Sequence, residues 1–335
     1  MDKNFGIAIS SRVRLARNVA DVPFPARLDD ERAFSVVMKA AEKTAKDLFK
    51  FKFYQMGHLP EIDRAALVER HLISNDLMAN LKTGAVIISD DETVSVMINE
   101  EDHYRIQCVL PGDSLGEAYK KANLYDDVLA TNVRVAYDEN LGYLTACPTN
   151  LGTAMRASVM LFLPALTINR GISAIINAVA KVGLTVRGVY GEGSKAEGYL
   201  YQVSNQVSLG VSEQDVLRMV QNAVDTICRQ EQLARDDLKA RQGINLVDSV
   251  SRAYGVLTNA CKMSSSELVE LMSEYKLGVY SGLLECKSPD ALEKLQVLCQ
   301  PANLSKIAGK QLSASDRDIF RAEYVKKQLK SISKK

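Results

Sequence analysis

Short runs rich in β-branched and apolar residues are confined to the middle of this chain, and that confinement constrains the fold more than any other feature. The runs are AVIIS at residue 85, VSVMIN at 94, RIQCVL at 105, VRVAY at 133, LTAC at 144, LTVRGVY at 184 and YLYQVSN at 199. Because such residues favour strands, the runs predict a sheet. After about residue 236 no comparable run occurs, so a second, sheet-free part is expected.

Helical patterns surround and follow the predicted strands. In residues 30–49, apolar or small residues recur at three- and four-residue steps, as they do along one face of a helix. Further helical segments are predicted at residues 62–81, 114–129 and 154–181. Ser212 with Asp215 predicts the N-terminal cap of another helix, and residues after 236 contain four or more helical patterns, several led by Ser or Asp. We therefore expect an α/β (α+β) fold with two domains, residues 1–235 and 236–335.

Composition excludes several classes of protein. Forty-two basic residues nearly cancel forty-one acidic ones, so no general attraction to nucleic acid or an anionic membrane is expected. The longest apolar stretch, 157–168, contains Pro164 and is shorter than the ~20 residues of a membrane helix. The N-terminus lacks the order of a signal peptide, and the six cysteines are single, without zinc-like spacing. We expect a cytoplasmic protein with free thiols and no protein-bound metal cluster.

Arginines are the first functional signal. Those at positions 12, 14, 105, 156 and 187 fall in or beside predicted strands and turns. Arginine grips phosphate oxygens with a fixed, two-pronged fork, so the set could bind a polyphosphate. Surface arginines or structural ion pairs remain the alternative for any single one.

Carboxylates are the second signal. Glu100, Glu101 and Asp102 form an acidic run beside His103, and Glu192 lies between two glycines. Two separated carboxylates facing one guanidinium could bind it and remove its proton, which matters because a guanidinium has a pKa of about 12.5 or higher. A solvated turn is the alternative. Neither GVYGEGSK at 188 nor IAGKQ at 307 has the spacing of a phosphate-binding loop.

Four segments taken together resemble the phosphagen kinases, the family of creatine and arginine kinases. They are SSRVRLARN at 10, NEEDHYRIQ at 99, CPTNLGTAMRAS at 147 and RGVYGEGSKAEG at 187, followed by SNQVSLG, in the family's order. The resemblance covers about residues 10–235. It implies an antiparallel sheet flanked by helices, with ATP and Mg²⁺ across the sheet and in-line phosphoryl transfer to a guanidino nitrogen.

The resemblance assigns residues by position. Glu101 and Glu192 match the glutamates that hold the guanidinium, with Glu101 as the base, and Cys147 matches the cysteine beside it. The implied nucleotide site comprises Ser10, Ser11, Arg12, Val13, Arg14, His71, Arg105, Arg156, Ala157, Ser158, Val159, Met160, Arg187, Gly188, Val189, Tyr190 and Gly191.

The C-terminal half points to a subfamily. Phosphagen kinases for small metabolites carry about a hundred residues of helical domain before SSRVR, whereas here the extra helices follow the catalytic segments. This order resembles the bacterial protein-arginine kinases. The sequence RDIFRA also matches their RDxxRA motif, which implies an allosteric phosphoarginine site at Arg317, Asp318, Arg321 and Ala322. On a helix, the two arginines would share one face, as they also would on an ordinary solvated surface.

The subfamily resemblance implies partners. They are arginine-containing protein substrates, among them a stress-response repressor and misfolded or aggregated proteins, together with a Clp protease, an activator protein and a second copy of the chain. Two alternatives stay open. One is a kinase for free arginine or another small guanidino compound, and the other is an inactive adaptor that only binds phosphoarginine.

Overall fold

The computed structural model describes residues 4, 6–28, 31–188 and 197–332. Within these ranges, eight strands form one antiparallel sheet in the order β2-β3-β4-β5-β1-β8-β10-β9, and two short strands form a separate hairpin. The strands are β1 (Ala8–Arg17), β2 (Phe51–Gln55), β3 (Ala85–Ser89), β4 (Val94–Ile98), β5 (Tyr104–Pro111), β6 (Tyr137–Asp138), β7 (Gly142–Tyr143), β8 (Met155–Phe162), β9 (Leu184–Gly188) and β10 (Leu200–Asn205). The expected antiparallel sheet flanked by helices is confirmed.

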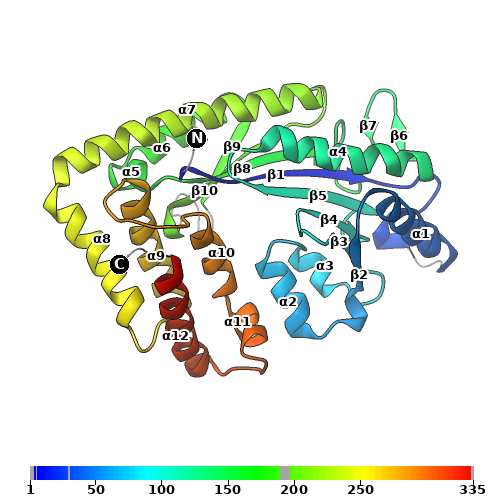
Figure 1. The fold of residues 1–335 in the computed structure, drawn as a ribbon. Helices are drawn as coiled ribbons and strands as arrows, with labels where there is room; N and C mark the ends of the chain where they lie inside the picture. Colours follow the sequence, from blue (N-terminus) through cyan, green and yellow to red (C-terminus); the bar gives the residue numbers. More distant parts are fainter. Residues whose placement is uncertain (1–3, 5, 29–30, 189–196, 333–335) are drawn as a thin grey trace.

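Helices lie on both sides of this sheet and continue to the end of the described chain (Figure 1). They are α1 (Glu31–Leu48), α2 (Glu61–Glu69), α3 (Asn75–Ala79), α4 (Leu115–Asn132), α5 (Pro164–Ile168), α6 (Ile172–Ala180), α7 (Glu213–Gln242), α8 (Ile244–Asn259), α9 (Ser265–Tyr280), α10 (Ala291–Leu298), α11 (Pro301–Ile307) and α12 (Ala314–Ile332). Short 3₁₀ turns occur at Pro25–Arg27, Met56–His58, Pro148–Asn150 and Glu197–Tyr199. Among the described helices, none is long and apolar enough to cross a membrane.

The two faces of the sheet differ because side chains alternate along each strand. On the central strand β1, Val13 and Leu15 are fully buried in the main apolar core. This core lies under α1, α4, α6 and α7, and Figure 1 shows α4 and α7 running along that side of the sheet. Arg12 and Arg14 alternate with these residues, so they belong to the opposite face.

Two smaller apolar clusters flank that opposite face. Under α2 and α3, Val86 and Met97 pack with Leu67 of α2. At the other end of the sheet, Phe162 and Leu200 pack with residues of α7, α8 and α9. The stretch of sheet between these clusters therefore remains free to present polar side chains.

The helices α8, α9, α10 and α12 enclose an apolar cluster of their own around Leu257, Met272 and Leu329. Several begin with the caps that their sequence predicted. Ser264 and Glu267 form a reciprocal capping box at α9, and Ser212 accepts a hydrogen bond from the Asp215 amide at α7. Helix α7 is continuous through residue 236, and the division into domains at that position stays a prediction.

Several predicted elements are wrong. The segment 154–181, expected as helix, begins with strand β8, and only α5 and α6 in its remainder are helical. The runs at 133 and 144 are not strands apart from Tyr137, and β1 and β2 were absent from the predicted set. The helix expected at 62–81 is two helices, because His71 adopts a left-handed φ of 60° and Ser74 caps α3. This division comes from a local turn and cap, whereas pairing with β1 and β10 makes the β8 segment a strand.

Candidate functional site

Strand register gathers the five predicted arginines on the polar face of the sheet. Arg14 on β1 lies directly opposite Arg156 on β8, and Arg105 on β5 lies opposite the next β1 residue of the same face, Ala16. Arg187 on β9 lies opposite Gln202 of β10, and Gln202 lies opposite Met160 of β8, which is on the same face. Residues that lie opposite each other in antiparallel strands share a face, so residues 175 positions apart meet on one surface.

These cations repel one another. Burial, together with the charges of Arg105 and Arg156, lowers the pKa of Arg12 to about 10. The pKa of Arg14 is lowered by burial and by the same neighbours. Burial and the charges of Arg187 and Arg105 lower the pKa of Arg156. Each protonated guanidinium therefore has an unfavourable environment that an added anion would relieve.

Little in the protein neutralises this cluster. Within the part of the chain that the structure describes, Arg105 forms an ion pair with Glu100, and no carboxylate reaches ion-pair distance of the other four. The Nε atoms of Arg14 and Arg156 are buried without a hydrogen-bond partner among these residues. Since buried donors are nearly always satisfied, these orphan donors indicate a place for a polyanionic ligand.

The remaining residues of the predicted nucleotide site divide between the two faces. Ser10, Ser158 and Met160 share the face of the arginines, as their strand register requires. Val13, Ala157 and Val159 are fully buried in the core on the other face. Ser11 is also buried, where its hydroxyl donates to the Gly112 carbonyl at 2.9 Å and accepts from the Ser114 amide. Gly188 ends β9, while Val189, Tyr190, Gly191 and Glu192 lie outside the described residues.

His71 lies beside the arginine cluster. Its carbonyl accepts a hydrogen bond of 2.7 Å from Gln107 of β5, the residue opposite Arg14 in the sheet. Desolvation of its imidazole and the charge of Arg12 lower its pKa, although the residue is exposed. A neutral imidazole there adds a hydrogen-bonding group without adding to the repulsion.

A cavity of about 180 Å³ opens where the arginines meet the acidic run. Its lining comprises Arg14, Leu15, Ala16, Glu100, Glu101, Asp102, Arg105, Asn150, Ala154, Met155, Arg156 and Ser208. Partial burial and the nearby charges of Asp102 and Glu100 raise the pKa of Glu101. Burial opposes the ionisation of Glu100, but Arg105 and Ser74 outweigh it and lower that pKa. Adjacent carboxylates thus have opposite shifts, which is typical of acid–base sites.

The segment that carries Cys147 borders this cavity. The Cys147 sulfur lies 3.0 Å from the Thr149 hydroxyl, and Asn150 lines the cavity three residues later. The Ala146 amide donates to Asp102 at 2.7 Å. The Cys147 segment and the acidic run are therefore joined next to the cavity.

Residues missed by the sequence interpretation fix the acidic run. Asp102 accepts a 2.6 Å hydrogen bond from Asn18, which also accepts one from the His103 amide. The His103 Nδ1 atom accepts from the Val19 amide, so its Nε2 atom carries the proton donated to the Pro23 carbonyl. Burial lowers the pKa of His103, in keeping with this neutral tautomer. Asn18 belongs to the SSRVRLARN segment, but no pattern in that segment predicted its partners.

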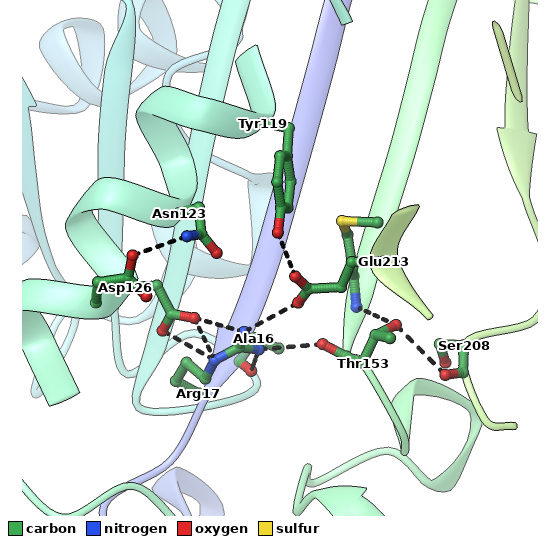
Figure 2. A network of polar contacts seen from close by, with 10 residues as sticks. Ala16, Arg17, Tyr119, Asn123, Asp126, Thr153, Ser208 and Glu213 are labelled. Atoms are coloured by element: carbon green, nitrogen blue, oxygen red, sulfur yellow. Dashed lines mark hydrogen bonds and ion pairs between the residues drawn. The ribbon is translucent and has the colours of Figure 1, made fainter. Parts of the chain in front are cut away.

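Arg17, from the same segment, organises the other face of the sheet (Figure 2). It is fully buried, and its guanidinium donates to both carboxylate oxygens of Asp126 at 2.6–3.0 Å. It also donates to the Thr153 carbonyl at 3.2 Å and stacks on the Tyr143 ring at 3.4 Å. Glu213, which accepts from Tyr119, lies 3.7 Å away. This network fixes the chain next to the Cys147 segment.

The RDxxRA residues lie on α12 and differ in environment. Arg321 is fully buried, donating to the Cys299 and Met263 carbonyls and to Asp318 at 2.7–3.0 Å. Ala322 is fully buried in the core of the C-terminal helices. Arg317 is half-buried and lines a cavity of about 630 Å³ between α2, α11 and α12. Of the two arginines, Arg317 is thus the one with a side chain toward open space.

Comparison with known proteins agrees with this geometry. Residues 33–234 match the sequence model of the ATP:guanido phosphotransferase C-terminal catalytic domain. The chain belongs to the ATP:guanido phosphotransferase family. Residues 243–335 match the model of the protein-arginine kinase McsB C-terminal domain. The resemblance to this family and its protein-arginine kinase branch is therefore confirmed, and the chain is a phosphotransferase.

Relatives within the ATP:guanido phosphotransferase family match over nearly their whole length. A protein named protein-arginine kinase from Caldanaerobacter subterraneus subsp. tengcongensis is 48% identical over 327 residues, covering 96% of this chain and 97% of the relative. One of the same name from Clostridium kluyveri is 45% identical, covering 97% and 95%.

Solved structures of the same family share the fold. The duplicated taurocyamine kinase from Schistosoma mansoni, with bound transition-state analogue components, has a TM-score of 0.62 at 25% identity. The match covers 75% of this chain and 38% of that one. A lombricine kinase has a TM-score of 0.60 at 23% identity, covering 69% and 67%.

Proposed function

We propose that this chain is a protein-arginine kinase, which transfers the γ-phosphoryl group of ATP to guanidino nitrogens of arginine side chains in proteins. The observation that carries the proposal is the cluster of five arginines on one face of the sheet, of which Arg14, Arg105 and Arg156 line a cavity that Glu101 also lines. The match of the C-terminal helices to the McsB domain supports a protein substrate, as do relatives named for that activity.

In this proposal each group has one task. The arginine forks hold the phosphates and stabilise the negative charge that spreads over the transferred group. Glu101 accepts the proton of the attacking nitrogen, a role suited to a carboxylate with a raised pKa. Glu192 would hold the guanidinium from the other side, and Cys147 would orient it. Holding both reactants in line provides much of the rate increase.

Mg²⁺ belongs to the proposal as a companion of ATP. Such an ion usually keeps several waters and binds through substrate phosphates with one or two carboxylates. The acidic run beside the orphan donors of Arg14 and Arg156 fits this arrangement, and this run would supply the carboxylate. When bound, it supplies neutralisation of the phosphate charge.

A comparison of two substrates tests the function. Incubation with Mg-ATP and a casein-like protein is expected to produce phosphoarginine, detected by mass spectrometry under conditions that preserve the acid-labile P–N bond. Free arginine is expected to be a much poorer acceptor. Preferential phosphorylation of free arginine would favour a small-molecule kinase, and the absence of transfer to either would favour an inactive adaptor.

The C-terminal helices would bind phosphoarginine at the cavity that Arg317 lines. The guanidinium of Arg317 is a charge-assisted donor suited to a phosphoryl group, whereas Arg321 would maintain the pocket by its bonds to main-chain carbonyls. Asp318 and Ala322 complete the motif.

Arg317→Ala is expected to remove the response of activity to added phosphoarginine and to leave basal activity near the wild-type level. The measurement is the rate of phosphotransfer against phosphoarginine concentration. Arg241→Ala, on the exposed side of α7, is the matched control. A normal response in Arg317→Ala would contradict the assignment.

Within a bacterial cell we place this activity in the cytoplasm. The proposed substrates are a stress-response repressor and misfolded proteins, which the modification would mark for a Clp protease. An activator protein and a second copy of the chain are the other proposed partners. A phosphoarginine-enriched proteome compared with that of a strain lacking this kinase would test these substrates.

A further inference from the structure

The C-terminal helices dock on the catalytic part of the chain through one carboxylate. Glu69, the last residue of α2, accepts hydrogen bonds of 2.8 Å from the Ala302 amide, the Asn303 amide and the Asn303 side chain. Helix α11 has no side-chain cap of its own, so Glu69 satisfies donors that a helix N-terminus otherwise leaves open. Figure 1 shows α11 facing α2 at this contact.

An ion pair between the same two helices accompanies this contact but is weaker. Lys306 of α11 lies 2.6 Å from Asp63 of α2, and both side chains are about one third or more exposed. Exposed pairs contribute little, whereas hydrogen bonds from three donors to one half-buried carboxylate also fix its orientation. Glu69 is therefore the main polar link between the two helices.

His71, which belongs to the proposed nucleotide site, lies directly after the end of α2. It is two residues beyond Glu69, and its left-handed backbone conformation stops α2 from continuing. Its amide donates to the Val68 carbonyl at 2.8 Å, and its own carbonyl is bound by Gln107 of the sheet. The end of α2 is thus held between α11 on one side and strand β5 on the other. Because Gln107 lies opposite Arg14 in the sheet, its hydrogen bond places the backbone of His71 against the face that carries the arginines.

We propose that Glu69 is a positioning residue: by holding α11, it fixes the end of α2 and keeps His71 against the arginine face of the sheet, so that the C-terminal helices set nucleotide affinity. The inference rests on the proposed function, in which the arginine cluster binds ATP. It adds a chain of contacts through which the C-terminal helices affect nucleotide binding at the sheet.

A ligand in the cavity next to this contact could change the contact between α2 and α11. Glu69, Lys306 and Arg317 all line the same space of about 630 Å³ between α2 and α11. An occupant that engages the two cations lies against the Glu69 carboxylate. It therefore alters the electrostatic balance of the contact without reaching the nucleotide site.

The test compares Glu69→Gln with Glu117→Gln in the full-length protein, by calorimetric titration with a non-hydrolysable ATP analogue and Mg²⁺. Both substitutions replace a carboxylate by an amide of the same shape, but Glu117 lies on the surface of α4, where it pairs with the exposed Lys120. Glu69→Gln is expected to weaken nucleotide binding about fivefold or more, the lower range of typical coupling between sites. Glu117→Gln is expected to bind as the wild type does.

A double-mutant cycle separates positioning from general damage. If Glu69 acts through His71, adding Glu69→Gln to His71→Ala causes no further loss of affinity, because the positioned group is already absent. Asn303→Ala, which removes one donor from the α11 side, is expected to weaken binding in the same direction but less. This second variant keeps the test valid if Glu69→Gln folds poorly.

Two results overturn the inference. One is wild-type affinity in both Glu69→Gln and Asn303→Ala. The other is an equal loss from Glu69→Gln with and without His71, which would mean that the contact acts elsewhere. Failure of the wild-type protein itself to bind the analogue would instead overturn the proposed function, and the inference with it.

Discussion

Replacement of Glu101 by Gln is expected to lower phosphotransfer to a protein substrate by about 10²–10⁴-fold, the usual contribution of a positioned general base. The amide keeps the size of the side chain but cannot accept the guanidino proton. Nucleotide affinity is expected to stay near the wild-type value, because the proposed phosphate-binding groups are the arginines that line the same cavity. The measurements are kcat from initial rates and the Kd of an ATP analogue.

Glu117→Gln, on the exposed surface of α4, is the matched control for Glu101→Gln. It removes a carboxylate from an ordinary surface pair and is expected to leave both quantities unchanged. Turnover of Glu101→Gln within a few fold of wild type would show that proton removal does not depend on this carboxylate.

The pH dependence follows from the raised pKa of Glu101. Its ordinary value is 4.5, and burial with Asp102 and Glu100 moves it upward. The base works only when ionised, so kcat/KM is expected to fall as pH drops through this raised pKa. The same acid limb is expected to be missing from the residual activity of Glu101→Gln.

The sequence motifs located the site more reliably than the local patterns located the elements. Arg12, Arg14, Arg105 and Arg156 were selected as residue types, and strand register brings them onto one face. Strand β8, which carries Arg156, was nevertheless expected as helix. Six of the eight residues of its sequence MRASVMLF are buried, and such short apolar runs fit either structure by periodicity alone.

Other parts of the site depend on contacts that no local pattern contains. The anchors of the acidic run come from residue 18 and from the amide of residue 146. The cap on α11 comes from Glu69, more than two hundred residues earlier in the chain. Long-range pairs of this kind are decided by topology, which the mixed order of strands and helices left open.

Arg17 is the clearest example of such long-range contacts, and its replacement by Ala is expected to lower the free energy of unfolding by about 3–5 kcal/mol, as breaking a buried ion pair does. The substitution leaves the Asp126 carboxylate buried with its main partner removed. It also leaves the Thr153 carbonyl without one donor and the Tyr143 ring without its cation. The measurement is equilibrium unfolding in urea, with the slope compared between variants to check that the transition is unchanged.

Arg134→Ala is the control, because Arg134 pairs with Asp21 and both side chains are at least 74% exposed. Surface changes of this kind are expected to stay within about 0.5 kcal/mol of wild type. A further comparison identifies the cause. Replacing both members of the buried pair, as in Arg17→Met with Asp126→Leu, is expected to cost less than Arg17→Ala, because no uncompensated charge then remains in the core. If the double variant is the less stable of the two, packing and not the stranded carboxylate explains the role of Arg17.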